Sequence, residues 1–131
     1  MNQQIIQRAI LAILFVAVMG CQNYGKETSA KGVQIFYTPQ VTTAEVEDLK
    51  RFLVSSGFAD GNPKTVQYTK EGNTYQFRMV TKKGVHLDPK FQQAFQLMTK
   101  ELSQGLFKGR SKVDVHVCDD KLQTIRVFVG D

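Results

Sequence analysis

The sequence predicts a single α+β domain, and two patterns in residues 33–131 indicate it. Along five short segments apolar and polar residues alternate, which is typical of strands with one buried face. In two longer segments apolar residues recur every three or four positions, which is typical of amphipathic helices. The whole chain has 131 residues, the length of one domain. The expected order is strand, helix, strand, strand, helix, strand, strand.

The first strand and the first helix follow from local signals. Residues 33–38 alternate at period two and predict a strand. Thr42 and Glu45 have capping-box spacing, in which the threonine hydroxyl accepts from the amide of Glu45 and the carboxylate reaches back. Gly57 supplies the left-handed residue that ends many helices. We therefore expect a helix over residues 43–56.

A β-hairpin is predicted around Gly72-Asn73, between strands at residues 65–69 and 74–81. A two-residue turn there places apolar residues opposite apolar ones and polar residues opposite polar ones. A slip of one residue would mix the two faces. The predicted pairs are Tyr68 with Phe77, Val66 with Met79, Thr69 with Gln76 and Gln67 with Arg78.

The second helix begins where Asp88 can cap it and Pro89 can occupy its first position. Apolar residues at helical spacing carry it to about Phe107. Residues 112–118 and 123–129 then alternate and predict a second hairpin.

Without its last strand, this order resembles the ferredoxin-like split βαβ arrangement. The resemblance implies an antiparallel sheet with both helices on one face, here extended at one edge into a βαββαββ order. The fold hosts many unrelated functions, so it assigns no activity by itself.

The N-terminus has the features of an export signal. Arg8 lies in a polar start, and residues 9–19 form an unbroken apolar run. The run is shorter than the roughly 20 residues that a membrane-spanning helix needs, and it fits a secretory signal peptide. The run is less typical of a buried core helix because it has no polar face.

The end of this run, Val18-Met19-Gly20-Cys21, resembles the lipobox of bacterial lipoproteins. The resemblance covers residues 1–21 and implies a diacylglycerol on the Cys21 sulfur and cleavage after Gly20. Valine replaces the usual leucine at the third position before the cysteine, and methionine replaces the usual small residue. We therefore expect a signal peptide at residues 1–20.

Residues 21–32 are polar and small, and they predict a flexible tether between a membrane and the domain at residues 33–131. Gln22 follows the cysteine, whereas an aspartate there would indicate inner-membrane retention in enteric bacteria. This slightly favours the outer membrane. Without residues 1–20, which contain Arg8 as their one charged residue, the net charge is 16 − 12 = +4, and this mildly basic charge is compatible with contact to anionic headgroups. No dense basic stripe is present, and no nucleic-acid partner is expected.

The alternation also assigns residues to the two faces of the sheet. In the last strand, Ile125, Val127 and Val129 are expected to face the helices. The opposite face, here called the open face, is expected to carry Gln34, Phe36, Thr38, Thr65, Gln67, Gln76, Arg78, Asp114, His116, Cys118, Thr124, Arg126 and Phe128. Apolar residues ringed by polar ones can mark an interaction site. The candidate binding residues are Phe36, Arg78, His116, Arg126 and Phe128. The alternative is an ordinary solvent-exposed face that carries two isolated aromatic residues and has no binding role.

His116 and Cys118 lie side by side on one expected strand, and imidazole with thiolate suits zinc or copper. Two ligands do not complete a site, and an ordinary buried cysteine is the favoured interpretation. No metal or other cofactor is expected.

An enzyme is not expected, because the chain has no Gly-x-Ser-x-Gly, phosphate-binding loop or His-Glu-x-x-His. The leading hypothesis is a non-catalytic, lipid-anchored protein of the bacterial cell envelope. It would bind a protein or other macromolecule through the open face or the edge of the last strand. The alternatives are a metal-handling or thiol-redox lipoprotein that uses His116 and Cys118, and a purely structural lipoprotein.

Overall fold

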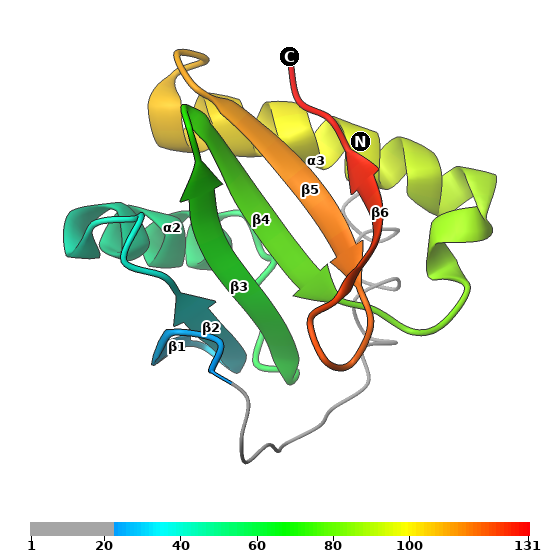
Figure 1. Ribbon diagram of the computed structural model, residues 1–131, viewed down its shortest axis with the longest axis horizontal. Coiled ribbons are helices and arrows are strands. Elements are labelled where there is room, and N and C mark those ends of the chain that lie inside the picture. The colour runs from blue at the N-terminus through cyan, green and yellow to red at the C-terminus, as the bar shows by residue number, and fades with distance from the viewer. Residues whose placement is uncertain (1–22) are drawn as a thin grey trace.

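The computed structural model describes residues 23–131. The expected signal peptide, the lipobox and Cys21 lie outside the described residues. The domain is α+β, as predicted, with one six-stranded sheet and two long helices (Figure 1). Its elements are β1 (Lys26–Ala30), β2 (Val33–Tyr37), α2 (Thr43–Ser55), β3 (Lys64–Glu71), β4 (Thr74–Val80), the short 3₁₀ helix η1 (Val85–Leu87), α3 (Pro89–Phe107), β5 (Lys112–Cys118) and β6 (Thr124–Phe128).

Both long helices cover the same face of the sheet, as predicted (Figure 1). The main core lies between this face and the helices, and its buried residues come from α2, α3 and the strands between them. Among the described residues, 23–131, no helix is long and apolar enough to cross a membrane.

The antiparallel sheet of the ferredoxin-like resemblance is wrong. The strands follow their order in the chain, and β2–β3 and β4–β5 are parallel neighbours. Each helix therefore joins two adjacent parallel strands, whereas a split βαβ arrangement places another strand between them. Alternation assigns the faces of a strand and leaves its direction open, which is why the sequence did not reveal the parallel pairs.

Residues 26–30, expected within the flexible tether, form strand β1. β1 pairs antiparallel with β2, with Lys26 opposite Tyr37 and Ala30 opposite Val33. Its sequence, Lys-Glu-Thr-Ser-Ala, has almost no apolar residues, so it gave no strand signal. The ordered domain therefore begins earlier than predicted.

The predicted local signals of the helices are confirmed. Thr42 Oγ1 accepts from the Glu45 amide at 3.1 Å, and Glu45 Oε1 accepts from the Thr42 amide at 2.8 Å. Asp88 caps α3 by accepting from the Lys90 amide at 2.9 Å.

The hairpin register is also confirmed in all four predicted pairs, from Val66 opposite Met79 to Thr69 opposite Gln76.

The face assignment of β6 is wrong. Phe128 lies opposite Val115 and is buried in the main core, where its ring centroid is 5.3 Å from that of Phe95. Ile125, Val127 and Val129 are exposed instead, at 43%, 38% and 57%. The cause is a bulge opposite the Val117–Cys118 step, which shifts the register of β6 by one residue.

Candidate functional site: an apolar pocket between the helices

A pocket opens between the C-terminal part of α2, the loop that follows it, and α3. Its volume is about 340 Å³, within the range of small-molecule sites. Apolar side chains dominate its lining, and the polar groups are few. The lining residues are Phe52, Leu53, Ser56, Gly57, Phe58, Phe77, Met98, Glu101, Leu102 and Gln104.

The two helices approach closely beside this pocket at Phe52 and Gly105. A Cβ atom at Gly105 would overlap the Phe52 ring. Glycine at this position therefore leaves room for the Phe52 ring, and a larger residue would force that side chain to move. Leu102 of α3 and Phe77 of β4 line the pocket beside this contact.

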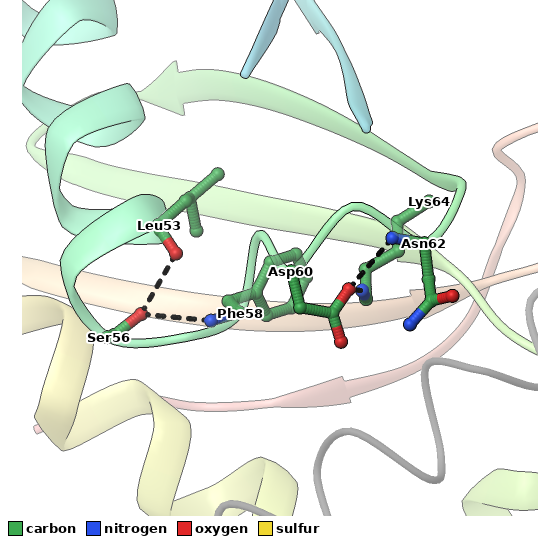
Figure 2. Close-up of polar contacts among 6 residues, drawn as sticks. All are labelled: Leu53, Ser56, Phe58, Asp60, Asn62 and Lys64. Atoms are coloured by element: carbon green, nitrogen blue, oxygen red, sulfur yellow. Dashed lines mark hydrogen bonds and ion pairs between the residues drawn. The ribbon is translucent and has the colours of Figure 1, made fainter. Parts of the chain in front are cut away.

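The loop from α2 to β3 forms one wall of the pocket, and hydrogen bonds hold it. Figure 2 shows Ser56 Oγ between the carbonyl of Leu53 and the amide of Phe58. Gly57 takes the left-handed conformation, with φ 84°, that turns the chain out of the helix. Phe58 then turns inward onto Phe77, with ring centroids 5.4 Å apart.

A buried ion pair fixes the far end of the same loop. The Lys64 side chain is 0% exposed and its Nζ contacts Asp60 Oδ1 (Figure 2). Lys64 Nζ also lies 5.8 Å from the centroid of the Phe58 ring. Burial opposes ionisation of Asp60, but hydrogen bonds from Lys64 and the Asn62 amide outweigh it and lower the pKa of this carboxyl. The wall residue Phe58 is therefore held between Ser56 and this ion pair.

Neither the pocket nor the ion pair was predicted from the sequence. A signal for Lys64 was present, because period-two alternation places it on the same face as Val66 and Tyr68. The helix-facing side of the strand therefore begins with a lysine, and a buried lysine needs a carboxylate partner nearby. The pocket depends on the spacing of two helices, which alternation does not describe.

The open face carries a hydrogen-bonded network centred on Arg78. Its guanidinium donates to Gln67 Oε1 at 2.8 Å, to Thr124 Oγ1 at 2.9 Å and to the Leu122 carbonyl at 2.6 Å. Gln67 in turn donates to the Tyr24 carbonyl at 2.9 Å. Arg78 therefore ties the N-terminal segment and the β5–β6 loop to the sheet.

His116 is part of the same network and is buried, with 7% of the residue exposed. Its Nδ1 accepts from Arg78 Nη1 at 3.1 Å, which places the proton of the neutral ring on Nε2. Burial, followed by the Arg78 charge, lowers the pKa of His116 to about 4. The imidazole is thus neutral at pH 7.

Cys118 lies in a second small core on the open face, with Val80 and Leu122. Tyr24 and Phe36 pack against this cluster, and their rings meet edge to face at 5.3 Å. Burial raises the pKa of the Cys118 thiol to about 11. Because the thiolate is the form that binds metals and exchanges disulfides, this position disfavours both activities.

The five predicted binding residues do not form one surface. Phe36, Arg78 and His116 share the open face, where they contact covering segments of the chain itself. Arg126 and Phe128 lie on the other side of β6, where the guanidinium carbon stands 4.6 Å from the ring centroid. Within residues 23–131 no group of three or more His, Cys, Asp or Glu side chains is placed to hold a metal.

Comparison with known proteins identifies the family. Residues 28–127, more than half of the chain, match the family model AF_1994_N, described as a family N-terminal domain. The chain belongs to this family. No curated protein and no solved structure matches it.

Proposed function

We propose that this protein is a non-catalytic, lipid-anchored binding module that takes an apolar group into the pocket between α2 and α3. The observation that carries the proposal is the pocket itself, about 340 Å³ and lined mainly by aromatic and aliphatic side chains. A preformed apolar hollow with a few polar groups at its rim is typical of ligand sites. The apolar group belongs to a small ligand or to a side chain of a partner.

Support for the anchor comes from residues 1–21 of the sequence. The apolar run before Cys21 and the lipobox-like Val18-Met19-Gly20-Cys21 favour export and lipidation. The proposed location is the bacterial cell envelope, with the domain attached to a membrane through lipid on Cys21. Two or three acyl chains hold a protein firmly at a bilayer.

The pocket is a better candidate than the open face. The polar groups of Arg78 already donate to Gln67, Thr124 and Leu122. A partner that used them would have to break these bonds first. The aromatic and aliphatic side chains that dominate the pocket lining form no hydrogen bonds that a ligand would have to break, and removal of water from apolar surface drives occupation.

Binding of N-phenyl-1-naphthylamine, a neutral apolar dye, tests the proposal. The protein for this titration is residues 23–131, which include every described strand and helix and the whole core. The blocking variant is Gln104→Trp, because Gln104 is exposed at the rim and an indole there covers the opening. The matched control is Gln93→Trp, on the same helix, exposed and away from the pocket.

The expected result is saturable binding of the dye to one site. Gln104→Trp should raise the Kd about tenfold or more, which corresponds to about 1.4 kcal/mol of binding free energy. Gln93→Trp should leave the Kd unchanged. Equal binding by all three proteins, or no saturable binding to the unsubstituted one, would contradict the proposal.

A further inference from the structure

The pocket between α2 and α3 has one negatively charged side chain in its lining. Among the described residues that line it, Glu101 is the one that carries a charge. Glu101 is partly buried and lies one helical turn after Met98, so both side chains lie on the same face of α3. The chain as a whole has more basic than acidic residues. The charge at the pocket is therefore opposite in sign to the net charge of the protein.

Glu101 has no cationic partner within residues 23–131. The three ion pairs of this part of the chain join other residues. The preceding Lys100 is exposed and does not line the pocket. Helical ion pairs form between residues three or four positions apart, and those positions around Glu101 hold no basic residue. They hold Leu97, Met98, Gln104 and Gly105.

The C-terminal end of α2 adds a second negative contribution. Phe52, Leu53 and the C-cap residue Ser56 all line the pocket, so this end of the helix forms part of its wall. The C-terminal end of a helix carries the equivalent of about half a negative charge. The last turn of α2 has no basic residue that would offset it. A cation in the pocket is therefore favoured from both helices.

The basic side chains of α2 and of the loop wall are already paired. Lys50 and Arg51 each contact an acidic residue one turn earlier on α2. Lys64, at the far end of the loop, contacts Asp60. Each of these pairs is neutral as a whole, so the charge that they leave unbalanced at the pocket is that of Glu101.

The apolar part of the lining also suits a cation. Phe52, Phe58 and Phe77 place three phenyl rings around the pocket. Cations are attracted to the faces of aromatic rings, and sites for quaternary ammonium ligands commonly combine several rings. Aromatic and aliphatic walls with one carboxylate match a ligand that has an apolar body and one positive charge.

We propose that the pocket binds a small cationic amphiphile, with its apolar body between α2 and α3 and its ammonium group beside Glu101. This inference rests on the proposed function, because it requires that the pocket holds a ligand. A small molecule is the assigned occupant because the volume of about 340 Å³ lies in the range of small-molecule sites. An anionic ligand of the same size is disfavoured, because its charge would meet the Glu101 carboxylate and the negative end of α2.

The test compares three naphthalene probes of nearly equal size by isothermal titration calorimetry with residues 23–131 at pH 7 and low salt. 1-Naphthylmethylamine is cationic, 1-naphthalenemethanol is neutral and 1-naphthoate is anionic. Glu101→Gln removes the charge and keeps the length of the side chain. The matched control is Glu71→Gln, which removes the same charge at an exposed position on β3 outside the pocket. Binding of the alcohol reports whether the pocket is intact in each variant.

The amine should bind about fivefold more tightly than the alcohol, the scale of a partly exposed ion pair, and the naphthoate should bind most weakly. Glu101→Gln should remove most of this preference by raising the Kd of the amine, with the Kd of the alcohol unchanged. Glu71→Gln should leave both Kd values unchanged.

Two results would overturn the charge preference alone. They are equal Kd values for the amine and the alcohol, and a preference for the amine that survives Glu101→Gln; in both cases binding of the neutral alcohol would still support the pocket. If neither the naphthalene probes nor N-phenyl-1-naphthylamine bind, the proposed function fails and this inference fails with it.

Discussion

Replacing Asp60 with asparagine should destabilise the domain through the charge that it leaves on Lys64. The asparagine oxygen can still accept from the Asn62 amide, a bond of 3.0 Å, so the turn is kept and only the charge is lost. Lys64 remains with its side chain 0% exposed and without its carboxylate. Stranding one partner of a buried pair costs about 3–5 kcal/mol. Because the Asp60 side chain is 22% exposed, we expect the lower end, about 3 kcal/mol.

Two further variants distinguish the cost of leaving a buried charge unpaired from the cost of losing a salt bridge of any kind. Asp48→Asn breaks the exposed pair with Arg51, whose side chains are 53% and 70% exposed, and should cost less than about 1 kcal/mol. Lys64→Met breaks the same ion pair as Asp60→Asn, but it strands the partner that water can reach. It should therefore cost clearly less than Asp60→Asn.

Urea unfolding of residues 23–131 at pH 7 measures these differences. The pKa of Asp60 is lowered in the folded state, so its stabilisation is present above about pH 4 and fades as the pH falls toward the folded pKa. The difference in the free energy of unfolding between the unsubstituted protein and Asp60→Asn should therefore become smaller as the pH falls below about 4. Equal costs for Asp60→Asn and Asp48→Asn at pH 7 would refute the reasoning.

Three further predictions follow from the buried groups. Because the pKa of His116 falls to about 4, below its unfolded value near 6.5, stability should decrease as the pH falls from about 6.5 to 4, by about 3 kcal/mol. Urea titrations at pH 7, 5 and 4 check this, and His116→Gln should flatten the slope; an unchanged slope would contradict it. Cys118 has a pKa of about 11 and no exposed surface, so it should resist iodoacetamide at pH 8 in the folded protein and react in urea. Peptide mass spectrometry measures the labelling. Rapid labelling of the folded protein would contradict the buried position of this thiol. Phe128→Ala should lower the free energy of unfolding by about 3–5 kcal/mol because Phe128 is a core residue. Phe36→Ala should lower it less because the Phe36 ring is only partly buried. Urea unfolding measures both, and a larger loss for Phe36→Ala would contradict the burial of Phe128.

Local patterns predicted the parts of the fold that depend on local physics. The capping box at Thr42 and Glu45 and the hairpin around Gly72-Asn73 involve residues a few positions apart, and both were placed correctly. The relative direction of neighbouring strands was not predictable in this way, because apolar and polar residues alternate in the same manner in parallel and in antiparallel strands. The parallel pairs β2–β3 and β4–β5 were therefore missed.

The candidate site was predicted least well, and β6 shows why. Alternation assumes an uninterrupted strand, but the bulge near Cys118 turned Phe128 inward and Val127 outward. The candidate binding residue Phe128 is thus a core residue, and the three expected core residues Ile125, Val127 and Val129 are exposed. The pocket lies beside the contact between Phe52 of α2 and Gly105 of α3, and a contact between residues so far apart in the chain has no periodic signature in the sequence.

The most direct test of a lipid-anchored binding module is the intact mass of the protein purified from the membranes of its host. The account predicts a chain that starts at Cys21 and carries acyl groups. A chain that still starts at Met1, or one that starts at Cys21 without lipid, would contradict the anchor on which the proposed function depends.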